Sequence, residues 1–288
     1  NTLLNTITNI VKPIDYKSMN APISPQEVLA AIANIATDKA PGPDGLGSEF
    51  YKTFSADLIP LLTEVYQKCI DQGSIPNFIS NATIHLLFKK GDRQEIGNWR
   101  PISLLNVDYK ILSKIITERM KKCLPKILHP DQKGFVPTRR LEDAVIKASS
   151  LIDYCNFKSL PNYMILLDQE KAFDRVSRKY LHAILEKFNF PPLIRNAIKA
   201  MYAETTTNIS INGQLTSAVP LNSGVRQGCP LSPTLFALCI EPLGNLIRSN
   251  QNYSGIKISE SNSYKISKFA DDTVFFVKDQ NDHDIALE

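Results

Sequence analysis

The sequence contains little of what builds zinc sites, membrane spans or secretion signals. Its five cysteines show no C-x-x-C spacing and only four histidines accompany them, so the pattern does not indicate a zinc site. No apolar stretch approaches the length of a membrane span, and no charged-then-apolar segment at the N-terminus is typical of a signal peptide. We therefore expect an intracellular chain with reduced, buried thiols and no membrane contact.

The composition is that of a folded protein with an uneven charge distribution. Of the 288 residues, 43% are hydrophobic and 22% are charged, which allows a sizeable core and is not typical of disorder. The first residue is Asn1 rather than Met, so we expect an internal piece of a longer polyprotein. The net charge is +4, yet residues 89–140 hold thirteen Lys and Arg against five Asp and Glu. This basic block favours a surface for a phosphate backbone, and a solvated helix face is the alternative.

The hydrophobic pattern predicts a mixed α+β fold with antiparallel hairpins. Apolar residues at helical spacing follow Ser24, which has the features of an N-cap, and recur in four later segments. The expected helices are residues 25–35, 58–69, 111–120, 180–188 and 236–247. Short runs of β-branched and aromatic residues predict strands, one of them followed by an Asn-Gly turn at residues 212–213. Residues 164–167 are a short continuous apolar run, which predicts a buried strand. The expected strands are residues 83–88, 164–167, 208–211, 264–269 and 273–277.

Three aspartates stand where predicted strands end. Asp168 follows residues 164–167, while Asp271 and Asp272 form the connection between two further strands. Carboxylates delivered by two neighbouring strands can hold two Mg²⁺ ions, the arrangement that stabilises an in-line displacement at phosphorus. Because aspartate is also a favoured turn residue, the adjacent pair alone would indicate only a turn. The third carboxylate shifts the interpretation towards a metal site.

Five strings of residues occur in order between residues 38 and 273. They are Lys-Ala-Pro-Gly-Pro-Asp-Gly at 39–45, Asn-Trp-Arg-Pro-Ile-Ser-Leu-Leu at 98–105, Asp-Gln-Glu-Lys-Ala-Phe at 168–173, Ser-Gly-Val-Arg-Gln-Gly-Cys-Pro-Leu-Ser-Pro at 223–233 and Phe-Ala-Asp-Asp at 269–272. Together they resemble the motifs of the reverse transcriptase domain of non-LTR (LINE-type) retrotransposons, in the family's own order. One such string is weak support, whereas an ordered set of five is highly specific.

This resemblance implies the fingers and palm of a right-hand polymerase. We expect the fingers, with an N-terminal extension, over residues 1–160 and the palm over residues 161–288. Residues 193–222 are a candidate to pack back towards the fingers. The family's last palm motifs and its thumb do not fall within this span, so we expect an incomplete palm and little processive synthesis by the isolated chain.

The resemblance also implies contacts with the incoming nucleotide. Lys89, Lys90 and Arg100 are candidates to grip the triphosphate, since Arg offers a bidentate fork to phosphate and Lys a point charge. Which lysine takes the inner position stays open, and an ordinary solvated lysine is the alternative for each. Gln227 and Gly228 lie in a loop expected to contact the nucleotide sugar and the template.

Phe173 has a more specific implied role. It lies five residues after Asp168, which matches the family position beneath the incoming sugar. An aromatic ring there would exclude a ribose 2′-hydroxyl and so select deoxyribonucleotides. The alternative is a plain core residue after a strand.

Four residues are candidates for contact with template and primer, namely Lys110, Arg119, Gly224 and Arg226. For the first two, a solvated helix surface is a competing account.

The resemblance thus implies an RNA-directed DNA polymerase that extends a DNA primer along an RNA template. It would use dNTPs and two Mg²⁺ ions, with Mn²⁺ as an alternative. The remainder of the polyprotein would supply the thumb and an endonuclease, and the nucleus or a ribonucleoprotein particle is the expected location. An intron-encoded or bacterial-type reverse transcriptase is the alternative enzyme. An inactive remnant that only binds nucleic acid is the alternative outside the enzymes.

Overall fold

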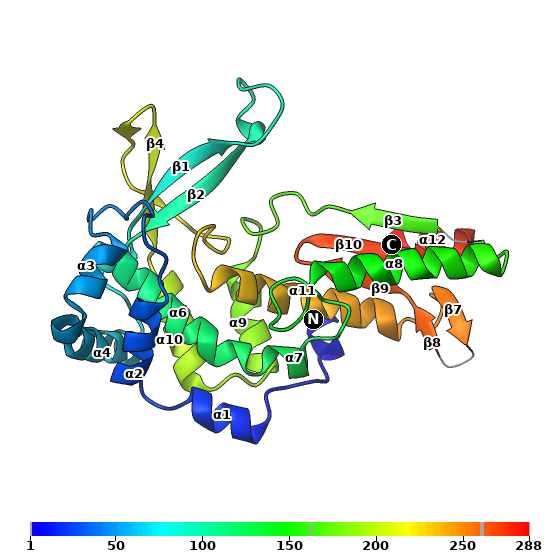
Figure 1. The fold of residues 1–288 in the computed structure, drawn as a ribbon, viewed down its shortest axis with the longest axis horizontal. Coiled ribbons are helices and arrows are strands. Elements are labelled where there is room, and N and C mark those ends of the chain that lie inside the picture. The colour runs from blue at the N-terminus through cyan, green and yellow to red at the C-terminus, as the bar shows by residue number, and fades with distance from the viewer. Residues whose placement is uncertain (1, 162, 260–261, 288) are drawn as a thin grey trace.

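The computed structural model describes residues 2–161, 163–259 and 262–287, and its fold is mixed α+β. Helices fill most of the first half of the chain (Figure 1). The longer helices are α2 (Pro25–Ala33), α4 (Ser55–Gln72), α6 (Val107–Lys121), α8 (Leu141–Phe157), α9 (Arg178–Lys187), α10 (Pro192–Tyr202) and α11 (Ser232–Ser249). The shorter segments are η1 (Leu3–Thr6), α1 (Pro13–Met19), α3 (Ser48–Thr53), α5 (Asn77–Ser80), η2 (Ile96–Asn98), α7 (Leu124–Ile127) and α12 (Gln280–Leu287). Within the described ranges, no helix has the length and apolar character that crossing a membrane requires.

The first sheet combines strands from both halves of the chain. β1 (Ala82–Phe88) and β2 (Trp99–Leu105) form an antiparallel hairpin, and β4 (Thr206–Ile211) pairs with β1 in parallel. The short strands β5 (Gln214–Leu215) and β6 (Val219–Pro220) pair with β4. The β1–β2 hairpin projects away from the helices (Figure 1).

The second sheet lies at the other end of the molecule, with α8 beside it (Figure 1). Its strand order is β3 (Tyr163–Leu167), β10 (Asp272–Val277), β9 (Ile266–Phe269), and all neighbours are antiparallel. A small hairpin of β7 (Ile256–Ser259) and β8 (Asn262–Tyr264) follows α11. The strand predicted over residues 264–269 is therefore wrong in extent, because Lys265 separates β8 from β9.

Local sequence explains where several elements begin and turn. Ser24 and Glu27 form a capping box: the Glu27 carboxylate accepts from the Ser24 backbone N–H at 3.0 Å, and the Ser24 hydroxyl accepts from the Glu27 backbone N–H. This pairing satisfies N–H groups that a helix start leaves free. Between β4 and β5, Asn212 and Gly213 both have positive φ (50° and 82°). That geometry is the one an Asn-Gly hairpin favours, so the predicted turn is confirmed.

One large hydrophobic core joins the two halves of the chain. It draws buried side chains from α2, α4, α6, α9, α10 and α11, and runs from Ile7 to Ile240. A smaller cluster joins α8 to the second sheet, through Leu151 and Cys155 against Phe276. Helix α8 precedes the boundary predicted at residue 160 but packs with the second sheet. Strand β4 pairs with β1 of the first sheet, in line with the expectation that residues 193–222 pack back towards the first half of the chain.

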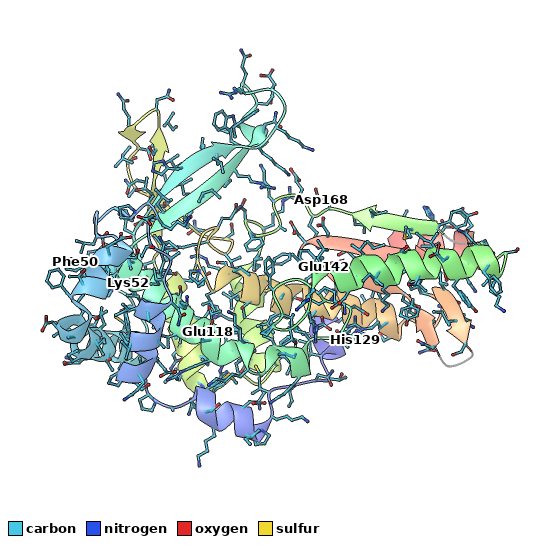
Figure 2. All side chains as sticks on the ribbon, in the orientation of Figure 1. Phe50, Lys52, Glu118, His129, Glu142 and Asp168 are labelled. Carbon is cyan, nitrogen blue, oxygen red and sulfur yellow. The ribbon has the colours of Figure 1, made fainter. Side chains whose placement is uncertain are left out.

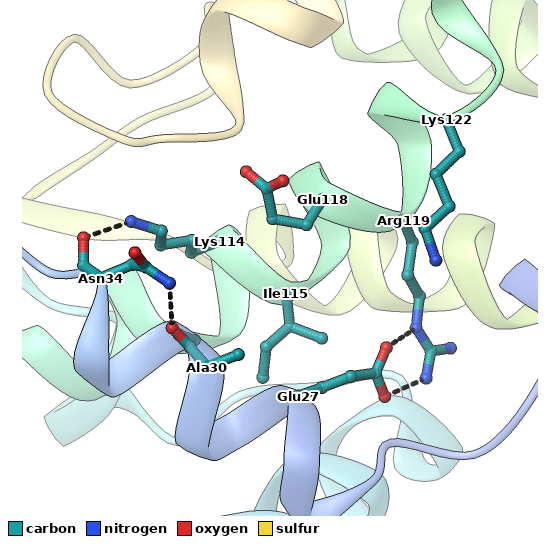
Figure 3. Close-up of a pocket in the computed structure, with 9 residues that line it drawn as sticks. Glu27, Ala30, Asn34, Lys114, Ile115, Glu118, Arg119 and Lys122 are labelled. Atoms are coloured by element: carbon teal, nitrogen blue, oxygen red, sulfur yellow. Dashed lines mark hydrogen bonds and ion pairs between the residues drawn. The ribbon is translucent and has the colours of Figure 1, made fainter.

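Arg119 of α6 fastens the N-terminal segment to the core. Its guanidinium forms two bonds with the Glu27 carboxylate, at 2.6 and 2.7 Å (Figure 3). It also donates to the backbone carbonyls of Met19, Ala21 and Pro22. The side chain is only 4% exposed, and these five bonds use its donors. The prediction that Arg119 contacts the template is therefore wrong.

Asp108, in the first turn of α6, makes stability depend on pH. Burial, with the negative charge of Asp44 added, raises the pKa of its carboxyl to about 7, although its Oδ1 accepts from the Tyr109 backbone N–H at 2.6 Å. Between about pH 4 and 7 the folded state keeps a proton that the unfolded chain has lost, so the free energy of unfolding falls as pH rises through this window. Asp108→Asn keeps the oxygen acceptor and removes the titration.

We expect Asp108→Asn to be more stable than the unaltered protein by about 1–4 kcal/mol at pH 8. This difference should shrink as pH falls towards 4, which chemical denaturation across this range measures. Asp57→Asn, in the first turn of α4, is the control for a carboxylate at a helix start. A pH-independent advantage of the Asp108 variant would contradict the assignment.

Candidate active site

Strand pairing brings the three predicted aspartates together at one edge of the second sheet. Leu167, the last residue of β3, pairs with Thr273 of antiparallel β10, so Asp168 and Asp272 lie next to each other. Asp271 lies in the two-residue turn that joins β9 to β10. In Figure 2, Asp168 is seen at the end of β3 that faces the rest of the molecule. The three carboxylates thus come from two neighbouring strands.

The electrostatics of this edge favour a cation. Asp168 and Asp272 are exposed, and Asp271 is half-buried. Partial burial, followed by the negative charges of Asp271 and Asp168, raises the pKa of the Asp272 carboxyl. A nearby positive charge would offset this repulsion. The donor chemistry is therefore that of a site for a hard divalent ion.

The site would be completed by other oxygen ligands. Among the residues that the structure describes, no three His, Cys, Asp or Glu side chains are gathered closely enough to hold an ion by themselves. Mg²⁺ usually retains waters and takes substrate phosphate oxygens beside one or two carboxylates. The three carboxylates at this sheet edge could supply some of the ligands of Mg²⁺, and water and substrate phosphate would supply the rest.

The loop of residues 223–228 docks against the segment that follows Asp168. The Gln227 side-chain amide donates to both carboxylate oxygens of Asp174, at 3.0 and 3.2 Å, and the Val225 backbone N–H donates to the Phe173 carbonyl at 2.8 Å. Gly224 is buried with φ of +80°, and a Cβ there would lie 2.9 Å from the Asp174 carbonyl oxygen. Close packing accounts for this glycine, which contradicts its predicted contact with template. Gln227 and exposed Gly228 remain candidates for the nucleotide.

Phe173 belongs to an aromatic cluster. Its ring stacks on Phe236 of α11, with centroids 5.1 Å apart and planes 10° apart. It meets Phe135 edge to face at 6.2 Å. The side chain is half-buried and packs against the main core. A ring held from two sides is a rigid wall close to the Asp168 segment.

The β1–β2 hairpin shows which of the three residues predicted to bind the triphosphate lie on the same face. Arg100 pairs with Leu87 across the hairpin. Lys89 and Lys90 both follow β1, and the Lys89 backbone N–H donates to the Asn98 carbonyl at 2.9 Å, so the pairing of the two chains continues by one residue. Since alternate residues of an extended chain share a face, Lys89 lies on the face of Leu87 and Arg100. All three cationic residues are exposed. Lys89 is therefore the lysine that shares a face with Arg100.

A basic groove runs along α6 beside the 223–228 loop. It is a 430 Å³ cavity whose lining includes Lys39, Lys110, Lys114, Lys121 and Gly228, and we call it the α6 groove. The adjoining cavity in Figure 3 shares Lys114 with it. Burial lowers the pKa of both Lys110 and Lys114. Bound phosphate would favour their charged forms, so the groove suits an anionic chain.

Arg226 does not lie in this groove. Its side chain is 4% exposed, its guanidinium stacks over the Tyr109 ring at 5.0 Å, and one nitrogen donates to the Ser80 carbonyl. The other two guanidinium nitrogens, Nε and Nη2, are buried without a partner among the described residues. This burial contradicts the predicted contact of Arg226 with template or primer.

Sequence reasoning missed two sets of residues near the site. Lys39 and Lys114 line the α6 groove, and the basic block was the available signal for Lys114. Gln132 bonds to the backbone of Ala270, which precedes Asp271 in the β9–β10 turn. No local pattern marks Gln132, because its partner lies 138 residues away.

Comparison with known proteins places these features in a family. Residues 88–288 match the model of the reverse transcriptase (RNA-dependent DNA polymerase) family. The chain is 38% identical over 271 residues to the transposon TX1 uncharacterized 149 kDa protein of Xenopus laevis, covering 94% of this chain and 21% of that protein. It is 26% identical over 273 residues to the RNA-directed DNA polymerase from mobile element jockey of Drosophila melanogaster, covering 91% of this chain and 28% of the relative.

A solved structure agrees at the level of fold. An apo telomerase of Candida tropicalis, truncated from the C-terminal domain, superposes with a TM-score of 0.53 at 13% identity, over 80% of this chain and 51% of that one. The chain spans about a fifth to a third of the length of the curated relatives it matches first. Enzymes of the matching family generally use a divalent metal, which the carboxylate edge can accommodate. The chain belongs to the reverse transcriptase family, with relatives among the non-LTR retrotransposon proteins.

Proposed function

We propose that this chain carries the RNA-directed DNA polymerase activity of a non-LTR retrotransposon protein. It would extend a DNA primer on an RNA template with dNTPs, in an intracellular ribonucleoprotein particle or the nucleus. The observation that carries the proposal is the meeting of Asp168 with Asp271 and Asp272 at one sheet edge, supported by the raised pKa of Asp272. The longer protein around the chain would contribute the other domains.

The carboxylates would hold two Mg²⁺ ions, or Mn²⁺ in their place. Bound metal would activate the primer 3′-hydroxyl and neutralise the charge of the leaving diphosphate. Asp168 and Asp272 are aligned by the β3–β10 pairing and Asp271 by the β9–β10 turn. These backbone ladders would hold the carboxylates in place during the reaction, as catalysis by positioning requires.

Cationic residues on two elements would handle the phosphates. Lys89 and Arg100 share a face of the hairpin and would contact the triphosphate, with Arg100 forming bidentate bonds. The α6 groove would take the sugar-phosphate backbone of the template or primer through Lys110 and its neighbouring lysines. Gln227, held by Asp174, would face the nucleotide sugar.

The direct test is RNA-templated primer extension by a protein that contains these residues. Synthesis should require dNTPs and Mg²⁺ and stop when EDTA is added. Addition of ribonucleotides alone, or absence of any product in Mg²⁺ and in Mn²⁺, would refute the proposed activity.

Salt dependence tests the α6 groove separately. Lys110→Gln and Lys114→Gln should each weaken binding of a primer–template and lower the slope of log affinity against log salt by about 0.7–0.9 for each lost phosphate contact. Lys68→Gln is the matched control, since Lys68 of α4 pairs with Glu64 at 2.6 Å on another surface. Equal slopes for the three variants would show that the groove does not bind the backbone.

A further inference from the structure

The β9–β10 turn, which carries Asp271, is hydrogen-bonded by the buried side chain of Gln132, a residue outside both strands. Gln132 is fully buried (0% exposed), and its Oε1 accepts hydrogen bonds from the backbone N–H of Ala270 at 3.1 Å and of Gly134 at 2.9 Å. Its Nε2 donates to the Ala270 carbonyl at 3.5 Å. Gln132 thus contacts both polar backbone atoms of the residue that precedes Asp271.

The backbone around Gln132 pairs with β9 as an additional parallel segment. The Lys268 N–H donates to the Asp131 carbonyl at 3.0 Å, and the Lys133 N–H donates to the Lys268 carbonyl at 2.8 Å. At Gly134 the contact is so close that a Cβ would lie 2.2 Å from the Ala270 nitrogen. These contacts fit the segment directly against the turn.

The turn needs such support because its conformation is unfavourable for its sequence. Ala270 has φ of +57° at the first central position of a two-residue hairpin turn. This left-handed region suits glycine, whereas a Cβ clashes there with the backbone. An alanine in this position stays left-handed only where surrounding contacts impose it. Here the contacts come from Gln132 and Gly134.

The segment that bears Gln132 is itself rigidly anchored. Asp131 accepts from Arg248 at 2.7 Å, and Arg248 in turn donates to buried Glu241 at 2.7 Å. Glu241 also pairs with buried Lys268 of β9 at 3.0 Å. Arg139 donates to the Gln132 carbonyl at 2.8 Å. A network of ion pairs therefore ties the segment and β9 to α11.

We propose that Gln132 is a positioning residue for polymerisation: it holds Ala270 in the left-handed conformation that presents Asp271 and Asp272 at the sheet edge. Gln132 acts through the turn and does not itself touch substrate or metal. The expected effect on polymerisation rests on the proposed function. The expected effect on the conformation of the β9–β10 turn rests on the geometry alone.

The first experiment measures the turn directly. In the unaltered protein the Ala270 amide should be protected from hydrogen exchange, because Gln132 is its hydrogen-bond acceptor. Gln132→Ala should accelerate exchange at Ala270 by at least about 10-fold while the amides of β10 stay protected. Lys133→Ala, which keeps the backbone bond of residue 133 to Lys268, is the matched control and should leave Ala270 unchanged. Unchanged exchange in Gln132→Ala would overturn the proposal.

The second experiment measures primer extension. Gln132→Ala should lower kcat by about 10- to 100-fold, as small displacements of reacting groups do, and raise the Mg²⁺ concentration needed for half-maximal rate. The KM for dNTPs should change less than about 3-fold. Absence of extension by the unaltered protein would refute the proposed function. The hydrogen-exchange experiment would still test whether Gln132 holds the turn.

A double variant separates positioning from general stability. Adding Ala270→Gly to Gln132→Ala should restore at least part of kcat, since glycine adopts positive φ without support. If Gln132 merely stabilises the fold, the added glycine should lower thermal stability further and restore no activity. That outcome would overturn the proposal.

Discussion

Asp271→Asn is expected to lower RNA-templated primer extension by at least about 10³-fold, the equivalent of several kcal/mol of transition-state stabilisation by metal-bound carboxylates. The amide has the size of the carboxylate and lacks its charge. Asp271 lies in the β9–β10 turn, so the strand pairing that aligns Asp168 and Asp272 is preserved. The measurement is single-turnover extension in Mg²⁺.

Binding of RNA gives the control for this variant. The α6 groove is formed by other elements, so affinity for a primer–template should change less than about 3-fold. Asp279→Asn is the matched substitution: Asp279 lies just beyond β10 and pairs with Lys278 at 3.5 Å. It should leave extension intact. Substantial synthesis by Asp271→Asn, or equal loss in both variants, would disprove the role of Asp271 in metal binding.

The meeting of the three aspartates at one sheet edge could be predicted because its information is local. Asp168 follows a continuous apolar run, and Asp271 and Asp272 connect two runs rich in β-branched and aromatic residues. A strand places the residue after it at the sheet edge. The β4–β5 turn was predictable for the same reason, since Asn212 and Gly213 favour positive φ themselves. Local preference and final structure agree at these positions.

The first sheet could not be predicted in the same way. β1 and β4 pair in parallel although more than 120 residues separate Ala82 from Thr207. β2 contains Pro101, which usually argues against a strand. Helix α8 was also missed. Its apolar residues face two ways, with Leu151 buried and Ile146 65% exposed, so no single face is marked in the sequence.

The errors at Arg119 and Arg226 have one physical cause: the sequence shows that a residue is cationic but does not show that its side chain is buried. Arg119 is buried with its donors bonded to Glu27 and to backbone carbonyls. Arg226 is buried with its guanidinium stacked on Tyr109 and one nitrogen bonded to the Ser80 carbonyl. Lys110 keeps its place as a nucleic-acid candidate because it lines a cavity with three other lysines. Buried arginines of this kind act in packing rather than in phosphate binding.

Phe173→Val is expected to raise the incorporation of ribonucleotides relative to deoxyribonucleotides by about 10-fold, in the range that steric changes of this size produce in an apolar pocket. The ring is fixed by stacking on Phe236 and by edge contact with Phe135, so it cannot rotate away from an added hydroxyl. Valine opens that space while much of the dNTP activity remains. Competition between matched ribo- and deoxyribonucleotides in primer extension measures the ratio.

The cost in stability must be separated from the change in selectivity, because the Phe173 ring also packs on the main core. Truncation should lower the free energy of unfolding by about 1–3 kcal/mol. Phe190→Val is the matched control: Phe190 is 1% exposed in the same core and makes none of the ring contacts of Phe173. It should lower stability at least as much and reduce both activities in proportion. If Phe173→Val behaves like Phe190→Val, the ring is a core residue and the sugar is selected elsewhere.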